Sequence, residues 1–258
     1  MVQPVSYLGH KVLQAPRVKE SYFAICRRDE GGHCLPSGQV GTTKPEEILT
    51  TPTGVQKPVP DYVGKPIQTS RHVPEEVETS SKDVIKNLSP SEKEAVTAYT
   101  GIDYEAVNKA MRACPPNFEC VQGKERKSML NIEKALELAK PLKQPVTVYR
   151  GIDVSLELAE TILAEAETAR EYDDIFQMSS IISTSLEADT AAAFTTKKSS
   201  IVFHIQARRG LYVESITRSK GEKEFIQSAK TRYRVVGTAY AQDVSSYERN
   251  VIYLEEVA

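Results

Sequence analysis

The sequence predicts an α+β fold, and two observations favour that class. Segments with helical periodicity gather mainly between residues 89 and 140, and strand-like segments dominate from Met178 onward. The regular strand–helix alternation that indicates a parallel sheet does not occur in this order. Helices and strands are therefore largely segregated along the chain.

The helical segments carry start and stop signals. Ser89, followed by Pro90 and Glu92, has the pattern of a capping box at a helix start. Gly101 is expected to end this helix, and Asp103 is expected to cap the next one. The other helices are expected over residues 125–140, 155–169 and 188–194.

Runs rich in β-branched and aromatic residues predict the strands. The first, Val146–Arg150, precedes the helix expected over residues 155–169. The later strands are expected over residues 178–185, 200–206, 211–214, 223–228, 231–238 and 249–255.

The composition limits the classes of function. Of the 258 residues, 40% are hydrophobic and 26% are charged, which is ordinary for a globular protein with a sizeable core. The formal net charge of -2 argues against a protein that coats nucleic acid. No apolar run approaches the length of a membrane span, and the first residues show no standard secretory signal. The compartment stays open, including delivery into a host cytoplasm or synthesis within it.

The N-terminal third differs in composition from the rest. Residues 36–81 are rich in Pro, Thr, Ser, Lys and Glu and lack periodicity, so they offer little apolar surface to offset chain entropy. Residues 1–81 are expected to form a largely disordered leader or docking segment, with an apolar island at residues 22–26. The globular domain is expected to span residues 82–258.

Four cysteines do not make a disulfide framework in a chain of this length. The pairs Cys26/Cys34 and Cys114/Cys120 could each close a short loop, but unpaired thiols are the preferred interpretation. The spacing, with His33 beside Cys34, matches no standard zinc motif, and no metal site is expected.

Three short segments stand out at strand ends: Tyr149-Arg150-Gly151, Ser183-Thr184-Ser185 and Glu222-Lys223-Glu224. Each alone is a weak signal, because short motifs often match by chance. Their order, strand context and spacing form a joint pattern that is much more specific.

These segments resemble the Arg, Ser-Thr-Ser and Glu-X-Glu signature of arginine-specific mono-ADP-ribosyltransferases related to the enzymatic components of binary toxins. The likeness includes residues 99–112 (YTGIDYEAVNKAMR) and covers residues 85–256. It implies an ADP-ribosyltransferase-like fold, with helices packed on a two-sheet, strand-rich core and NAD in a cleft. It also implies that ADP-ribose is transferred from NAD, the co-substrate, to a protein side chain.

The resemblance gives roles to individual residues. Glu224 would stabilise the oxocarbenium-like cation that forms when the bond between nicotinamide and ribose breaks, and Ser183 would orient it. Thr184 and Ser185 would be structural supports. Arg150 would bind the diphosphate or ribose region of NAD with its fork of donors.

Further residues are expected around NAD. Gly151 would let the nicotinamide amide approach the backbone, and Arg112 would contact a phosphate. Tyr104 would pack near the adenosine, and Asn108 would assist there or else serve as a capping or core residue. Phe176 is the nearby aromatic residue that could stack on nicotinamide or belong to the core.

Glu222 indicates the acceptor. In the resemblance, glutamate at this position accompanies arginine as the acceptor, and a carboxylate pairs with a guanidinium through two hydrogen bonds. The expected partner is a protein with an accessible arginine, modified by an enzyme that is expected to be a monomer. The preceding loop, residues 214–221, lacks the aromatic residue that relatives often carry, and Arg218 and Lys220 hint at an acidic partner surface.

Two other functions fit the same sequence. Water could replace arginine as the acceptor, which would make the protein an NAD glycohydrolase. The fold could also serve as a catalytically silent virion or effector module, although the complete set of Arg150, Ser183 and Glu224 argues against it. The sequence leaves the target protein open, and also the setting, whether toxin, phage factor or endogenous regulator.

Overall fold

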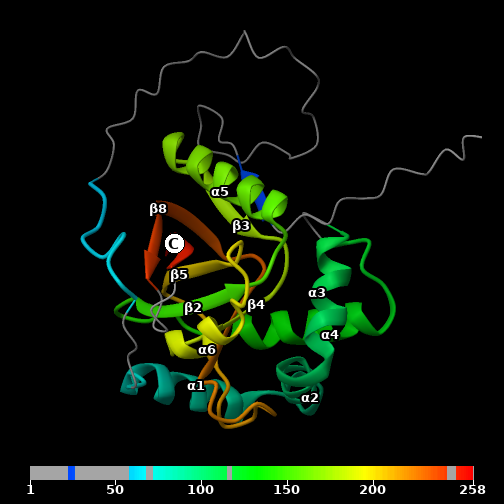
Figure 1. The fold of residues 1–258 in the computed structure, drawn as a ribbon. Coiled ribbons are helices and arrows are strands. Elements are labelled where there is room, and N and C mark those ends of the chain that lie inside the picture. The colour runs from blue at the N-terminus through cyan, green and yellow to red at the C-terminus, as the bar shows by residue number, and fades with distance from the viewer. Residues whose placement is uncertain (1–22, 27–57, 68–71, 115–117, 243–247, 258) are drawn as a thin grey trace, which may run out of the picture.

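The computed structural model of the chain describes residues 23–26, 58–67, 72–114, 118–242 and 248–257 (Figure 1). Its helices are α1 (Glu75–Asn87), α2 (Pro90–Ala98), α3 (Tyr104–Arg112), α4 (Gly123–Glu137), α5 (Leu156–Glu171) and α6 (Ala188–Ala193). Its strands are β1 (Phe23–Cys26), β2 (Val146–Ile152), β3 (Ile175–Met178), β4 (Ile182–Ser185), β5 (Ile201–Ala207), β6 (Leu211–Tyr212), β7 (Glu224–Gln227), β8 (Arg232–Gln242) and β9 (Glu248–Glu256). No helix within the described ranges is long and apolar enough to cross a membrane.

The strands pair in the order β1-β3-β8-β9-β5-β2-β4-β7-β6. β2 pairs with β5 along its whole length, but it pairs with β4 only at Tyr149 and Ser185. This single pair divides the order into a large half-sheet, running from β1 to β2, and a small half-sheet of β4, β7 and β6. The structure confirms the α+β class. The expected two-sheet core is present as these two half-sheets, which are joined at the pair of Tyr149 and Ser185.

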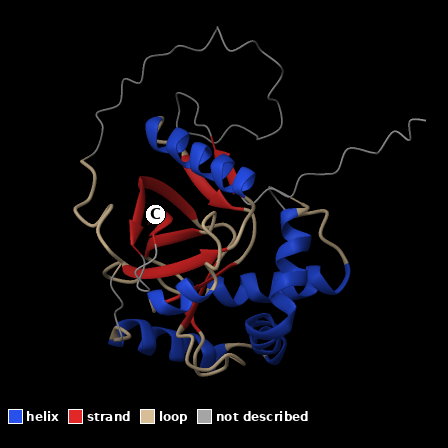
Figure 2. Cartoon of the chain, in the orientation of Figure 1, coloured by secondary structure: helices blue, strands red, loops and turns tan. Residues whose placement is uncertain are grey.

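Separate groups of helices cover the two half-sheets (Figure 1, Figure 2). α5 packs on the large half-sheet, where Ile162 and Phe203 belong to one core cluster. α2, α3 and α4 surround the small half-sheet, where Val96, Met111 and Ile226 belong to a second cluster. The first cluster also includes Ile182 and Phe225, so it runs from the large half-sheet onto one face of the small one, whereas α2, α3 and α4 cover the other face.

The ends of the first helices differ in part from the sequence-based expectation. The capping box is confirmed, with Ser89 N donating to Glu92 Oε2 at 2.9 Å and Glu92 N donating to Ser89 Oγ at 3.3 Å. The expected cap at Asp103 is wrong, because a wide π-type turn, Tyr99–Asp103, carries the chain on into α3 and kinks at Gly101. The Asp103 carboxylate pairs with Lys124 at 3.1 Å.

Most expected strands lie within a few residues of the observed ones, but the single strand predicted over residues 178–185 is wrong. β3 pairs with β8 in the large half-sheet, whereas β4 pairs with β7 in the small one. The buried residues 179–181 carry the chain from one half-sheet to the other. β1 falls in the apolar island of the N-terminal third and pairs with β3.

Residues 58–67, here called the strap, pack on the large half-sheet. Tyr62 stacks on His204 of β5 with ring centroids 5.2 Å apart. Gly237 of β8 leaves room for the strap, since a Cβ atom there would lie 2.6 Å from Val63 Cγ1. Alternate residues of a strand point to opposite faces, and the strap packs on the face of β5 and β9 that α5 does not cover.

Helix α1 runs across the domain boundary that the sequence analysis sets at residue 82. It begins at Glu75, and its residue Ser81 is buried. Ser81 Oγ accepts a hydrogen bond from Tyr212 N at 2.9 Å, which fastens α1 to β6. Ordered structure in contact with the sheet therefore precedes residue 82.

Cys114 and Cys120 form a disulfide, with their Cα atoms 5.6 Å apart. The preferred interpretation of unpaired thiols is wrong for these two residues, because the chain turns back after α3 and brings them together. Cys34 lies outside the described residues, and with it the pair Cys26/Cys34.

Substitutions at Tyr62 test how much the strap stabilises the fold. Tyr62 Oη donates to Glu255 Oε1 at 3.1 Å. Because Tyr62→Phe removes only this hydrogen bond, we expect it to lower the free energy of unfolding by about 1 kcal/mol. Tyr62→Ala also removes the stack on His204, and we expect a loss of about 2 kcal/mol or more. Chemical denaturation of the full chain measures both, and equal losses would show that the ring stack contributes nothing.

Candidate functional site

A cavity of about 680 Å³ opens where β2 and β4 part. Its walls come from the turn before α3, from α3 itself, from β2, β4 and α6, and from the residues that precede β7. The residues that carry the family resemblance line it together: Tyr104, Asn108, Arg112, Arg150, Gly151, Ser183, Glu222 and Glu224. Segments far apart in the sequence therefore form one site.

Glu224 is a buried carboxylate held by two hydroxyl groups. It is the first residue of β7, and its side chain is bonded to Ser183 on the neighbouring strand β4. Ser183 Oγ donates to Glu224 Oε1 at 2.5 Å, and Thr217 Oγ1 donates to Oε2 at 3.3 Å. Glu224 is only 4% exposed, so these contacts fix its direction at the cavity wall.

The next two residues of β4 bond to backbone. Thr184 Oγ1 donates to the carbonyl of Phe225 at 2.6 Å, and Ser185 Oγ donates to the carbonyl of Glu222 at 2.6 Å. Both hydroxyls tie β4 to the chain around Glu224.

The surroundings raise the pKa of both glutamates. Burial is the largest cause for Glu224, whereas the hydroxyls of Ser183 and Thr217 lower its pKa, and the nearby charges of Glu222 and Glu214 raise it further. Burial also raises the pKa of Glu222, and the charge of Glu214 adds to this. The cavity wall thus concentrates negative charge in a partly desolvated place, which suits a ligand or transition state that carries positive charge.

Arg150 spans the gap between the half-sheets. Its Nη1 atom donates to the carbonyl of Ser183 at 2.8 Å, beside the single pair formed by Tyr149 and Ser185. The guanidinium also lines the cavity, where its planar fork of donors can bind phosphate or hydroxyl oxygens. Arg150 therefore joins the two strands at the point where they diverge.

The wall formed by α3 combines a buried and an exposed part. Asn108 is 2% exposed, and its Nδ2 atom donates to Tyr99 Oη at 3.0 Å. Tyr99 Oη in turn donates to the carbonyl of Ile181 at 3.0 Å. Asn108 is thus a core polar residue that also lines the cavity, whereas Tyr104 is 41% exposed at the rim.

Gly151 makes room for a helix. A Cβ atom at this position would lie 2.0 Å from the carbonyl oxygen of Ala191 in α6 and 2.8 Å from Thr195 Cγ2. Only glycine lets α6 approach β2 this closely. The approach of α6 accounts for this glycine independently of any ligand.

Phe176 is a core residue. It lies on β3, fully buried among apolar side chains, and is not among the residues that line the cavity. Besides Tyr104, Phe194 is an exposed aromatic residue that lines the cavity; it lies directly after α6 and has 53% of its surface accessible. Phe194 is not predicted from the sequence because it follows the buried Ala191 at helical spacing, which is the pattern of a core residue.

Asp153 is a second residue that the sequence analysis misses. Its carboxylate accepts hydrogen bonds from the backbone and hydroxyl of Thr196 and from the hydroxyl of Ser200. These hydrogen bonds lower the pKa of Asp153 against the opposing effect of burial. They hold the segment that follows Phe194, and Asp153 and Thr196 line the cavity beside it.

The loop over residues 214–221 rests on the turn before α3. Arg218 N donates to Thr100 Oγ1 at 3.2 Å, and Ser219 Oγ donates to the carbonyl of Thr100 at 3.2 Å. Lys220 Nζ donates to the carbonyl of Glu214 within the same loop.

Through the described parts of the chain, no group of His, Cys, Asp and Glu side chains is arranged to hold a metal ion.

Comparisons with known proteins identify the fold. A family model described as ADP-ribosyltransferase exoenzyme matches residues 78–257. The chain is similar to Plx2a, an ADP-ribosyltransferase toxin from Paenibacillus larvae, with a TM-score of 0.54 and 20% identity, covering 70% of this chain and 93% of that one. It is similar to the C3 exoenzyme of Clostridium limosum, with a TM-score of 0.55 and 20% identity, covering 71% and 94%.

A third similar structure contains a ligand. Exoenzyme S from Pseudomonas aeruginosa, in complex with human 14-3-3 protein beta and bound to carba-NAD, has a TM-score of 0.51 and 23% identity, covering 69% of this chain and 82% of that one. At these identities the structural likeness shows the fold. No curated protein sequence matches the chain.

Glu224 leads to a prediction for stability against pH. Because its pKa in the folded protein is raised above the ordinary value of 4.5, its stabilising contribution is complete below pH 4.5 and is lost as the pH rises through the folded pKa. We therefore expect Glu224→Gln to be more stable than the parent at neutral pH, and we expect this advantage to shrink as the pH falls towards 4.5. Thermal unfolding between about pH 4 and pH 8 measures the difference. An advantage that does not change with pH would contradict this account.

Proposed function

Because the chain belongs to the ADP-ribosyltransferase exoenzyme family, we propose that it transfers ADP-ribose from NAD to an arginine of a target protein and releases nicotinamide. Enzymes of this family take NAD as their co-substrate, so the activity class is mono-ADP-ribosyl transfer of the toxin type. The acceptor and the role of each residue are the proposed parts.

The observation that carries the proposal is a pair of carboxylates with different surroundings on one cavity wall. Glu224 is buried and bonded to Ser183, whereas Glu222, two residues earlier, is partly buried and lines the same cavity. One carboxylate is held rigidly and the other is reachable from the cavity. This is the arrangement that a reaction needs when a cation must be stabilised and an acceptor must be engaged separately.

Glu224 would act on the cation. When the bond between nicotinamide and ribose breaks, nicotinamide leaves with the bonding electrons and the ribose carbon becomes oxocarbenium-like. A carboxylate fixed by Ser183 and Thr217 stabilises this charge without having to reorganise. An arginine nitrogen then forms the new bond to the ribose carbon and loses a proton.

Glu222 would engage the acceptor. A carboxylate matches the two-pronged geometry of a guanidinium and can accept the proton that the attacking nitrogen loses. The raised pKa of Glu222 makes it a stronger base than an ordinary glutamate. A protein partner with an accessible arginine follows from this role.

The remaining residues would bind NAD. Arg150 and Arg112 supply positive charge for its diphosphate, and Tyr104 offers an exposed ring at the rim for the adenosine side. Phe194 offers an exposed ring on the α6 side, in place of Phe176, for stacking on nicotinamide. Asn108 and Gly151 would shape the cavity, Asn108 through its bond to Tyr99 and Gly151 through the approach of α6.

Exchange of each carboxylate for its amide tests the division of labour. We expect Glu224→Gln to lower both NAD hydrolysis and transfer to agmatine, a small guanidinium compound, by about a hundredfold or more, because the cation loses its stabilising charge. We expect Glu222→Gln to lower transfer by about tenfold or more and to leave most of the hydrolysis. Labelled NAD follows both products, and when a protein mixture replaces agmatine, release of the label from protein by hydroxylamine identifies arginine.

The same assay separates the rival functions. Nicotinamide release by the parent chain without label on any guanidinium would favour an NAD glycohydrolase. Neither NAD binding nor turnover would favour a catalytically silent module. Equal loss of transfer and hydrolysis in Glu222→Gln would remove the proposed role of Glu222.

Arg150→Ala tests the binding role of the guanidinium. We expect the dissociation constant for NAD to rise by about tenfold or more, because a charged hydrogen-bonding group is lost from the cavity. Arg150→Lys keeps the charge but not the fork, so we expect an intermediate affinity. Calorimetric titration measures binding, and thermal unfolding reports the loss of the Ser183 contact. Unchanged affinity for NAD in Arg150→Ala would show that the guanidinium does not bind it.

A further inference from the structure

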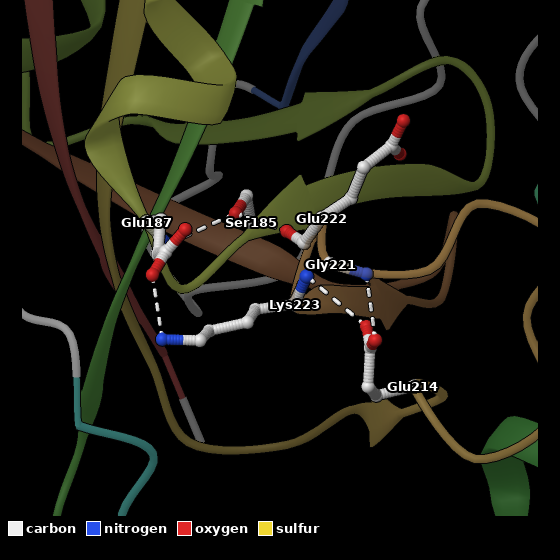
Figure 3. Close-up of polar contacts among 6 residues, drawn as sticks. All are labelled: Ser185, Glu187, Glu214, Gly221, Glu222 and Lys223. Carbon is white, nitrogen blue, oxygen red and sulfur yellow. Dashed lines mark hydrogen bonds and ion pairs between the residues drawn. The ribbon is translucent and has the colours of Figure 1, made fainter.

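Glu222 lies in a turn that Glu214 holds from outside (Figure 3). Glu214 Oε1 accepts a hydrogen bond from Gly221 N at 2.7 Å, and Oε2 accepts one from Lys223 N at 3.2 Å. The two oxygens of one carboxylate thus bind the amides on either side of Glu222. A contact of this kind fixes the orientation of a turn, and not only its position.

The turn needs such support because its backbone is strained. Gly221 has φ of +89°, and Lys223 has φ of +47°, a left-handed conformation that is unfavourable for a residue with a Cβ atom. Nothing lies within 4 Å of where a Cβ atom of Gly221 would be, so packing does not hold the turn there. The conformation at Lys223 persists because hydrogen bonds and an ion pair fix it.

Two contacts hold the other side of the turn. Ser185 Oγ donates to the carbonyl of Glu222 at 2.6 Å, and Lys223 Nζ pairs with Glu187 at 2.5 Å. The ion pair is largely shielded from solvent, with the side chains of Lys223 and Glu187 23% and 20% exposed. It draws Lys223 away from Glu222, whose side chain points away from both Glu214 and the ion pair (Figure 3).

We propose that Glu214 is a positioning residue for the acceptor step: by binding the amides of Gly221 and Lys223, it aims the Glu222 carboxylate at the incoming guanidinium. This inference rests on the proposed function. Glu214 is not among the residues that line the cavity, so it acts through the turn and not on a ligand. The contact requires a side chain with two acceptor oxygens, which glutamine lacks.

The role differs from general support of the fold. Glu224, which would act on the cation, is held by Ser183 and Thr217 and lies within β7, so the bonds of Glu214 do not fix its side chain. Misplacement of a reacting group by about 1 Å can cost about a hundredfold in rate. Loss of Glu214 therefore impairs the step that uses Glu222 more than the step that uses Glu224.

The test compares two reactions in the full chain. Glu214→Ala removes both hydrogen bonds, Glu214→Gln keeps one acceptor oxygen, and Glu160→Gln on the exposed surface of α5 is the matched control. We expect Glu214→Ala to lower transfer to agmatine by about tenfold or more, with NAD hydrolysis and KM for NAD within about threefold of the parent. We expect Glu214→Gln to lie between Glu214→Ala and the parent, and Glu160→Gln to match the parent.

A second measurement does not depend on the acceptor. Hydrogen exchange at the amides of Gly221 and Lys223 reports their bonds to Glu214 directly, and we expect it to be faster in Glu214→Ala than in the parent. Equal loss of transfer and hydrolysis, or unchanged transfer, would overturn the positioning role. If the parent modifies no guanidinium, the proposed acceptor is wrong, and the role of Glu214 in the acceptor step is wrong with it. Hydrogen exchange that is unchanged in Glu214→Ala would show, independently, that Glu214 does not hold the turn.

Discussion

The hydrogen bond from Arg150 to the carbonyl of Ser183 crosses the place where the two half-sheets part. β2 and β4 pair only at Tyr149 and Ser185, and the cavity opens where they diverge. Ser183 also binds Glu224 through its hydroxyl, so one residue joins the guanidinium on β2 to the carboxylate on β7. One core cluster also joins the half-sheets, since it includes Phe203 of β5 and Phe225 of β7, but the hydrogen bond of Arg150 lies at the cavity itself.

Positive and negative side chains lie on different walls of the cavity around this link. Arginines lie on the walls formed by β2 and α3, whereas Glu222 and Glu224 gather near the start of β7. Burial raises the pKa of both glutamates, the charge of Glu214 raises both further, and the charge of Glu222 also raises that of Glu224, so negative charge gathers unfavourably here in the absence of a cation. That cost is recovered when a positively charged transition state or a guanidinium lies against them. The charged glutamates at this wall therefore lower the stability of the folded protein, and the same charges serve the reaction.

The sequence predicts the site better than it predicts the path of the chain. Arg150, Ser183 and Glu224 are found together because their chemistry restricts the residue types and their order. The break between Met178 and Ile182 is missed because only three residues separate β3 from β4 and none of them is Gly or Pro, while serine, the residue type of Ser179 and Ser180, also occurs within β4 itself.

Other misses have the same kind of cause. Phe194 and Phe176 are not distinguishable by local pattern, since burial depends on which element packs opposite each residue. The Cys114–Cys120 disulfide depends on how the chain turns after α3, which spacing alone does not fix. The sequence does not indicate a role for Glu214, because its partners are backbone amides, which every residue type other than proline carries.

The place of β9 in the strand order has a consequence for how the protein acquires its structure. β9 pairs in parallel with β5 and antiparallel with β8. It therefore lies between these two strands and joins them into one sheet. Until it docks, β5 has an open edge in a strand whose residues are almost all buried in the finished protein. A chain that stops at that stage exposes an edge that can pair with another chain, and the pairing of β9 with β5 joins segments that are far apart in the sequence. We therefore expect assembly to be cooperative and late, with β9 closing the sheet.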